Sequence, residues 1–230
     1  VRDNDAIRVA VLTAAGEEDF CCGGDLGEVI PLWTGATQPS NPLEERLLND
    51  RLIADKIMLK DKPLYKPVIA AINGHAIGIG LTLPLQFDIR IAAANAKLSF
   101  AFVQRGIMPE MASTYILPRL IGIARASDLL RPGRIFLGEE AARLGVVNEA
   151  LESDQVLPRA REIARYIVEK CAPASVALTK RMIWEHLYAD DPLAVSEREA
   201  RGMARLGKLP DAAEGVLSFV QKRRPEWKLA

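Results

Sequence analysis

Apolar positions along this chain form two patterns, short continuous runs and residues at helical spacing. Runs rich in β-branched residues predict buried strands over residues 7–13 and 67–72, with shorter strands over 90–94 and 97–102. Between the first two runs, residues 43–60 carry apolar side chains at helical spacing and predict a helix. Strands and helices therefore alternate, as is typical of an α/β protein.

Helical spacing dominates towards the C-terminus. Helices are expected over residues 81–91, 138–145, from 153, over 174–188 and 192–206, and from 211. Ser153 is a candidate N-cap, Gly145 a C-terminal cap, and Asp211 with Glu214 a capping box. Because the strands stop near residue 150, we expect an α/β core over residues 1–150 and a helical region over 151–230.

Composition narrows the classes of function. The 230 residues have 49% hydrophobic and 26% charged content, and a formal net charge of zero, which disfavours a nucleic-acid binder. No apolar run approaches the roughly 20 residues of a membrane span, so no membrane partner is expected. Three cysteines without zinc spacing, and only two histidines, predict no metal site and a reducing, cytoplasmic location.

Two glycine-containing loops are the candidate binding elements. Residues 73–80 hold three glycines between a predicted strand and a predicted helix, where exposed backbone N–H groups can hold a phosphate or an oxyanion. Residues 20–26 place Gly23 and Gly24 before an acidic residue in a similar way. For each loop the alternative is a tight turn without a binding role. In residues 20–26, Asp25 would cap that turn. The adjacent Cys21 and Cys22 lack an identifiable base, so a nucleophilic role is disfavoured.

Two further stretches need an interpretation. Residues 30–42 contain three prolines and a glycine, and predict a loop long enough to act as a lid or pocket wall. Residues 105–122 contain Glu110 near the start of a predicted helix. Glu110 is either a helix-stabilising acid of a first turn or a catalytic group.

Taken together in this order, the motifs resemble those of the crotonase superfamily, the enoyl-CoA hydratase/isomerase family. The matching segments lie at residues 20–26, 73–80, 88–92, 105–110, 117–122, 138–141 and 222–225. The resemblance implies an α/β fold of the crotonase (ClpP/crotonase-like) type, a spiral of ββα units, with a C-terminal helical region that mediates trimers or hexamers. Members of the family usually have further strands before the position of Val1, and the chain is expected to lack them.

The resemblance also assigns residues to an acyl-CoA site. The backbone N–H groups of Gly24 and Ile79 correspond to the oxyanion hole that holds a thioester oxygen. Neighbouring residues correspond to the path of coenzyme A: Cys22, Gly24, Asp25, Leu26, Gly78 and Ile79. Coenzyme A would arrive as part of the substrate, as in fatty acid metabolism, and no tightly bound cofactor is expected.

The acid–base residues depart from the hydratase pattern. Hydratases of the family use two glutamates, and this chain has Thr82 and Phe102 at those positions. Glu110, in a Pro-Glu pair, matches the single glutamate of Δ3,Δ2-enoyl-CoA isomerases and is the expected base. The alternatives are a hydratase or other lyase with an acid from elsewhere, such as residues 30–42, and a non-catalytic acyl-CoA-binding or assembly protein. A dinucleotide-binding fingerprint and a serine-hydrolase elbow are both absent from the sequence.

Overall fold

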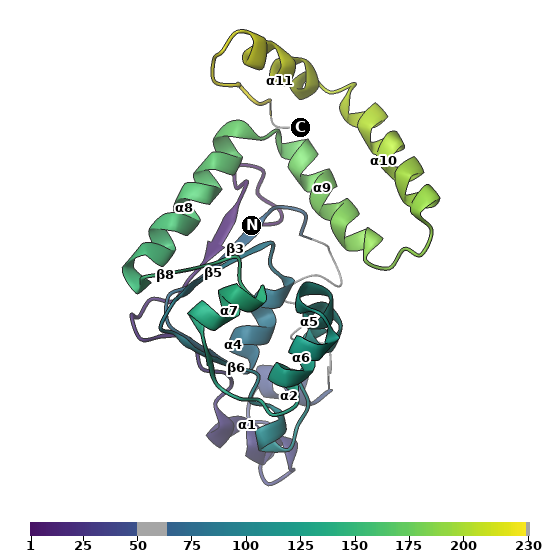
Figure 1. The fold of residues 1–230 in the computed structure, drawn as a ribbon. Coiled ribbons are helices and arrows are strands. Elements are labelled where there is room, and N and C mark those ends of the chain that lie inside the picture. Colours follow the sequence, from purple (N-terminus) through teal and green to yellow (C-terminus); the bar gives the residue numbers. More distant parts are fainter. Residues whose placement is uncertain (50–63, 229–230) are drawn as a thin grey trace. The chain divides into compact units, whose positions relative to one another are not determined.

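The computed structural model describes residues 1–49 and 64–228 (Figure 1). Its strands form two four-stranded sheets. The first sheet has the order β1 (Ala10–Leu12), β3 (Val68–Ile72), β5 (Ile89–Ala93), β8 (Glu149–Leu151). The second has the order β2 (Asp19–Cys21), β4 (His75–Ile77), β6 (Lys97–Ser99), β7 (Phe136–Leu137). In the second sheet β2, β4 and β6 run parallel, and β7 pairs antiparallel with β6.

The predicted strands at residues 67–72 and 90–94 are confirmed as β3 and β5. All five side chains of β3 are buried, and so are the last four of β5. This explains why β3 reads as a continuous apolar run instead of an alternating pattern, since a strand covered on both faces has no polar side. The one polar residue of β5, Arg90, is also buried and donates to the carbonyl oxygens of Val146 and Phe87. The strand predicted over residues 7–13 is shorter than expected, because only Ala10–Leu12 pair in the sheet.

By its contacts the chain divides into two compact units. One comprises Leu12–Pro63 and Ala70–Arg159, and the other comprises Val1–Val11, Leu64–Ile69 and Ala160–Ala230. The predicted boundary at residue 150 stays a prediction.

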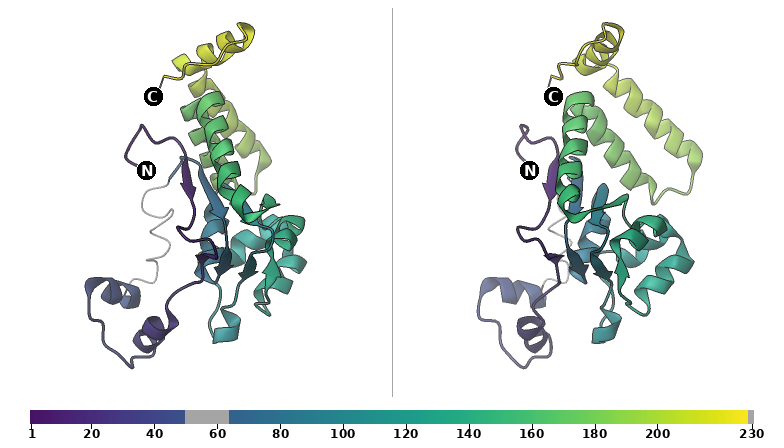
Figure 2. Two further views of the ribbon diagram at one scale, coloured as in Figure 1. Left: turned by 90° about the vertical axis from the view of Figure 1, so that its left-hand side faces the viewer. Right: turned by 60° about the vertical axis from the view of Figure 1, so that its left-hand side comes forward.

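The first of these units holds the second sheet and a set of short helices. They are α1 (Leu26–Trp33), α2 (Pro42–Asn49), α4 (Ile79–Thr82), the 3-10 helix η1 (Leu83–Gln86), the 3-10 helix η2 (Val103–Arg105), α5 (Ser113–Ile121), α6 (Ile123–Leu130) and α7 (Gly138–Leu144). Figure 2 shows α1 and α2 beside each other, away from the strands of this unit.

The other unit is mainly helical, although it also includes the first residues of β1 and β3. It contains most of α8 (Ser153–Lys170) and all of α9 (Pro173–His186), α10 (Pro192–Leu206) and α11 (Pro210–Val220). The prediction of a helix over residues 192–206 is confirmed by α10. Helices α9 and α10 pack together (Figure 1), and Gly202 permits their close approach because a Cβ there would lie 3.1 Å from Leu178 Cδ2.

Four sequence predictions for the first unit are corrected by the structure. Residues 30–33 are not loop but the end of α1, whose N-terminus Asp25 caps by accepting a hydrogen bond from the Gly27 amide at 2.9 Å. The helix expected over residues 81–91 ends at Gln86, since Ile89–Ala93 form β5. The segment 73–80 is not a direct strand-to-helix junction, because β4 lies within it. Of the strand predicted over residues 97–102, only Lys97–Ser99 pair as β6.

Two predicted helix caps are also wrong. The Ser153 hydroxyl donates to the Asn73 carbonyl oxygen at 2.6 Å instead of capping α8. Helix α11 begins at Pro210, so Asp211 lies in its first turn, where its Oδ1 accepts from the Lys228 amide. The helix predicted over residues 43–60 is confirmed as α2 up to Asn49, and the remainder of that prediction lies outside the described residues.

Candidate active site

The two glycine loops follow neighbouring parallel strands and lie against each other. Strand β2 leads into Cys22–Asp25, strand β4 leads into α4, and the two strands pair directly. A Cβ at Gly23, whose φ is +102°, would come 3.3 Å from the Ile77 carbonyl oxygen. A Cβ at Gly80 would overlap the Cys21 carbonyl oxygen and lie 2.8 Å from its carbon. Glycine at these positions is what allows the loops to meet.

The backbone amides of Gly24 and Ile79 lie in these adjoining loops. Ile79 is the first residue of α4, where the N–H has no partner within the helix. Gly78, just before it, has a φ of +60° and turns the chain from β4 into the helix. Among the described residues, the Gly24 amide donates no hydrogen bond within the protein. Each of the two contacting loops therefore carries a backbone N–H for which none of the described residues provides an acceptor.

The loop of residues 20–26 is open to solvent at its C-terminal end. Gly24, Asp25 and Leu26 are exposed, and Leu26 retains 47% of its accessible surface. The Asp25 side chain is occupied by its cap of α1. Asp25 thus fixes the end of the loop by capping the helix that follows it.

Cys22 is a thiol of low reactivity. Its Sγ donates to Asp19 Oδ1 at 3.2 Å. Partial burial, and then the hydrogen bond and charge of Asp19, raise the pKa of the Cys22 thiol to about 11. The thiolate is the nucleophilic form of cysteine, so Cys22 is a poor nucleophile near neutral pH.

The acid half of the site is Glu110, and the structure brings it to Thr82. The Thr82 hydroxyl donates to Glu110 Oε1 at 2.7 Å, and Thr82 is fully buried. Thr82 lies three residues after Ile79, about one helical turn along α4. The Glu110 carboxylate is therefore close to the amide half of the site, although 28 residues separate Thr82 from Glu110 in the sequence.

Glu110 does not lie in the first turn of a helix. Helix α5 begins three residues later at Ser113, whose amide donates to the Glu110 carbonyl oxygen at 3.1 Å. Between them, Met111 and Ala112 adopt the left-handed conformation with φ values of 59° and 55°. Each such non-glycine residue costs on the order of 1–2 kcal/mol. The interpretation of Glu110 as a helix-stabilising acid is thus wrong for this structure.

Sequence reasoning missed Gln86 as a residue near the site. It is 5% exposed, and its Nε2 donates to the Met111 carbonyl oxygen at 3.1 Å. An amide in an otherwise apolar helix, between Leu85 and Phe87, was the signal in the sequence. A buried polar side chain needs a partner, and this one finds it next to Glu110.

Phe102 closes the site beside the second loop. Its side chain is 9% exposed, and its Cζ would lie 3.9 Å from a Cβ at Gly78. A phenyl ring therefore lies beside the loop of residues 73–80, at one of the two positions where the resemblance leads one to expect a glutamate.

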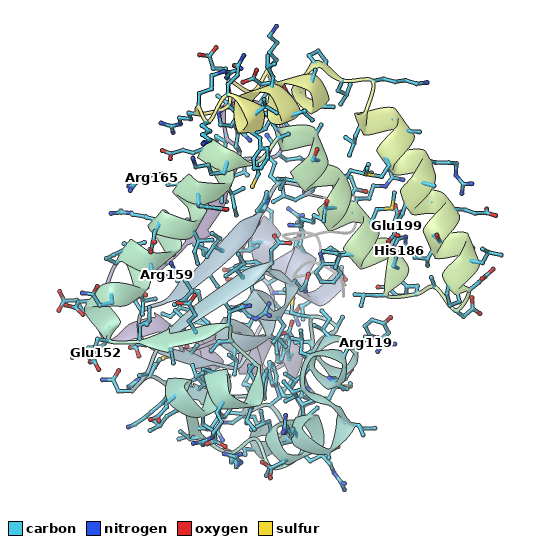
Figure 3. All side chains as sticks on the ribbon, turned by 45° about the horizontal axis from the view of Figure 1, so that its top comes forward. Arg119, Glu152, Arg159, Arg165, His186 and Glu199 are labelled. Carbon is cyan, nitrogen blue, oxygen red and sulfur yellow. The ribbon has the colours of Figure 1, made fainter. Side chains whose placement is uncertain are left out.

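Both histidines contact neighbouring elements of the protein. His75 Nδ1 accepts from the Lys97 amide at 3.0 Å and so joins β4 to β6. In the helical unit His186 of α9 and Glu199 of α10 face each other (Figure 3), with 3.8 Å between His186 Nδ1 and Glu199 Oε1.

Residues 1–49 and 64–228 contain no group of three or more His, Cys, Asp or Glu side chains placed to hold a metal ion. In the same residues, no helix combines the length and apolar character that a membrane span requires.

Comparison with known proteins assigns the chain to a family. The model of the enoyl-CoA hydratase/isomerase family matches residues 1–229, so this chain belongs to that family. An enoyl-CoA hydratase of Alternaria alternata is 36% identical over 230 residues, covering 98% of this chain and 72% of that protein. A short-chain-enoyl-CoA hydratase of Clostridium acetobutylicum is 32% identical over 227 residues, covering 98% and 82%.

The fold agrees with the family. An enoyl-CoA hydratase from Bacillus anthracis superposes with a TM-score of 0.85 at 32% identity, covering 100% of this chain and 84% of that structure. The predicted crotonase fold is therefore confirmed, and the chain is an acyl-CoA enzyme of this family.

Proposed function

We propose that this enzyme shifts a carbon–carbon double bond in an enoyl-CoA thioester, with Glu110 as its single acid–base residue. The observation that carries the proposal is the 2.7 Å hydrogen bond between Thr82 and Glu110. It brings one carboxylate to the position that a hydratase glutamate occupies in the resemblance. The second hydratase position is the phenyl ring of Phe102, so Glu110 is the one carboxylate among these three positions.

The amides of Gly24 and Ile79 have the complementary role. Removing a proton from C2 sends the electron pair onto the thioester oxygen, and two backbone donors stabilise the resulting enolate. Glu110 takes this proton from C2 and returns it to C4, while the double bond moves from C3–C4 to C2–C3. The proton is conserved, so one carboxylate suffices and no water is consumed.

The coenzyme A part of the substrate has a proposed path along the same loops. It consists of Cys22, Gly24, Asp25, Leu26, Gly78 and Ile79. The solvent exposure of Gly24, Asp25 and Leu26 supports this assignment, because a long ligand needs an open surface beside the buried reacting atoms.

Hydration of a trans-2-enoyl-CoA is the second candidate. The names of the relatives favour it, since those from Alternaria alternata, Clostridium acetobutylicum and Bacillus anthracis are called hydratases. In that reaction Glu110 alone would activate the water that adds to C3, a task that the two-glutamate enzymes share between two acids.

The test uses purified protein with trans-3-enoyl-CoA and trans-2-enoyl-CoA. We expect conversion of the first substrate, and a decrease in kcat of about a thousandfold for Glu110→Gln, because the variant keeps the shape but loses the proton acceptor. Glu139→Gln, an exposed residue of α7, makes the same chemical change elsewhere and should retain the wild-type rate.

Other outcomes identify the alternatives. Unchanged turnover by Glu110→Gln would contradict the role of Glu110. Hydration without isomerisation, lost in the same variant, would favour the second candidate. Binding of a thioester analogue without turnover of either substrate would indicate a non-catalytic acyl-CoA-binding protein.

A homotrimer or hexamer stays our prediction for the assembly. Six large apolar side chains of the helical unit are more than 60% exposed: Phe219 84%, Tyr188 74%, Met203 71%, Val220 70%, Leu193 70% and Val216 67%. Apolar surface of this extent is typical of a face that is covered in an assembly. Light scattering on the purified protein gives the number of subunits, and a monomer would contradict the prediction.

A further inference from the structure

A single helical segment contacts the loop of Glu110 twice. The segment is α4 followed by η1, and it begins at Ile79. Thr82 donates to the Glu110 carboxylate at 2.7 Å, and four residues later Gln86 donates to the Met111 carbonyl oxygen at 3.1 Å. Thr82 is the last residue of α4 and Gln86 the last residue of η1, so both bonds come from this one short segment.

The second bond holds a backbone conformation that the local sequence disfavours. Met111 and Ala112 are both left-handed, and neither is glycine. Such conformations persist only where the surroundings hold them. The Gln86 side chain is 5% exposed and that of Met111 3%, so this hydrogen bond is shielded from competing water.

We propose that Gln86 is a positioning residue for Glu110, an inference that rests on the proposed function. By holding the Met111 carbonyl, Gln86 keeps the turn of Met111 and Ala112 left-handed and so keeps the Glu110 carboxylate against Thr82. The distance from the oxyanion donor Ile79 to the acid is then set by one helical segment. Gln86 acts through the Glu110 loop and does not touch the substrate.

If Gln86 positions Glu110, the effect of a Gln86 substitution on kcat should depend on the residue at position 112. A general contribution of Gln86 to folding predicts no such dependence. Glycine adopts the left-handed conformation at little cost, so Ala112→Gly should make the turn less dependent on Gln86. The effects of Gln86→Met and Ala112→Gly on kcat should therefore be non-additive in a double-mutant cycle.

The experiment measures kcat and KM on the enoyl-CoA substrate that the wild-type protein converts. We expect Gln86→Met to lower kcat about tenfold with KM unchanged within about twofold, since a misplaced base affects the chemical step. In the Ala112→Gly background the same substitution should lower kcat by less than about threefold. If Gln86→Met does not fold, Gln86→Asn takes its place, because its amide is one methylene too short to reach Met111. The same changes in kcat and KM are expected for this variant in both backgrounds.

Gln104→Met is the matched control. Gln104 also donates its side-chain amide to backbone carbonyls, those of Pro132 and Gly133 at 3.0 and 2.9 Å, but it lies in η2. Its substitution should leave kcat within about threefold of the wild type.

Three results would overturn the inference. They are an unchanged kcat in the folded Gln86 variants, an equal decrease in both backgrounds, and an equal decrease in Gln104→Met. Glu110→Gln separates this inference from the proposed function. If Glu110→Gln loses activity and the Gln86 variants keep it, only the positioning role fails, whereas turnover by Glu110→Gln would refute the catalytic role itself.

Discussion

The two halves of the proposed site are held in different ways. The amide half comes from backbone at the ends of the paired strands β2 and β4, where Gly23 and Gly80 permit close contact. The acid half is one side chain on a loop, held by hydrogen bonds from Thr82 and Gln86. The strand pairing of the fold fixes the first half, and individual side chains fix the second. Substitutions in the acid half can therefore change the reaction while the fold stays the same.

In the amide half, the largest effect should follow removal of a backbone donor. Ile79→Pro deletes the N–H at the first position of α4, where a helix tolerates proline. We expect kcat to fall by about 10²–10³, or about 3 kcal/mol of transition-state stabilisation. Ile79→Val keeps the N–H and should keep most of the activity. Similar kcat values for the two variants would contradict the role of this amide.

The next prediction concerns stability and tests the close contact between Gly80 and the Cys21 backbone. Gly80→Ala places a methyl group on the Cys21 backbone, which must move, so the free energy of unfolding should fall by about 3 kcal/mol. Gly16→Ala is the control, since no atom lies within 4 Å of a Cβ at that position. Urea unfolding measures both variants. Equal stability of the two would show that the loops are not in the close contact described.

A smaller effect on kcat is expected when only the support of Glu110 is removed. Thr82→Val removes the hydroxyl that donates to Glu110, and a hydrogen bond of this kind is worth about 1.5 kcal/mol, so kcat should fall about tenfold. Thr82→Ser keeps the hydroxyl and should retain most of the rate. If the valine and serine variants turn over equally fast, Thr82 does not hold the base.

The amide half and the acid half also differ in how much of them the sequence alone predicts. Both glycine loops, strand β3 and helix α10 follow from local patterns of apolar residues, glycine and proline, and the structure contains the last two as predicted. Strand β4 was missed because three residues between glycines carry too little pattern, and it is its pairing with β2 and β6 that defines it.

The contacts of the acid half had no local signal. Thr82 and Glu110 meet only through the fold, and the residues between them include β5 and β6. The left-handed turn at Met111 and Ala112 runs against the preference of both residues, so propensity would place it elsewhere. Gln86 was visible as a polar residue in an apolar helix, but its partner was not.

The raised pKa of Cys22 affects whether this thiol can react with a thioester substrate. A thioester is an acyl donor, and a thiolate two residues from Gly24 would accept the acyl group by exchange and block the loop. With a pKa of about 11, only about one Cys22 side chain in ten thousand is ionised at pH 7. Burial and the hydrogen bond to Asp19 thus keep Cys22 in the protonated form, which is a poor acceptor for an acyl group.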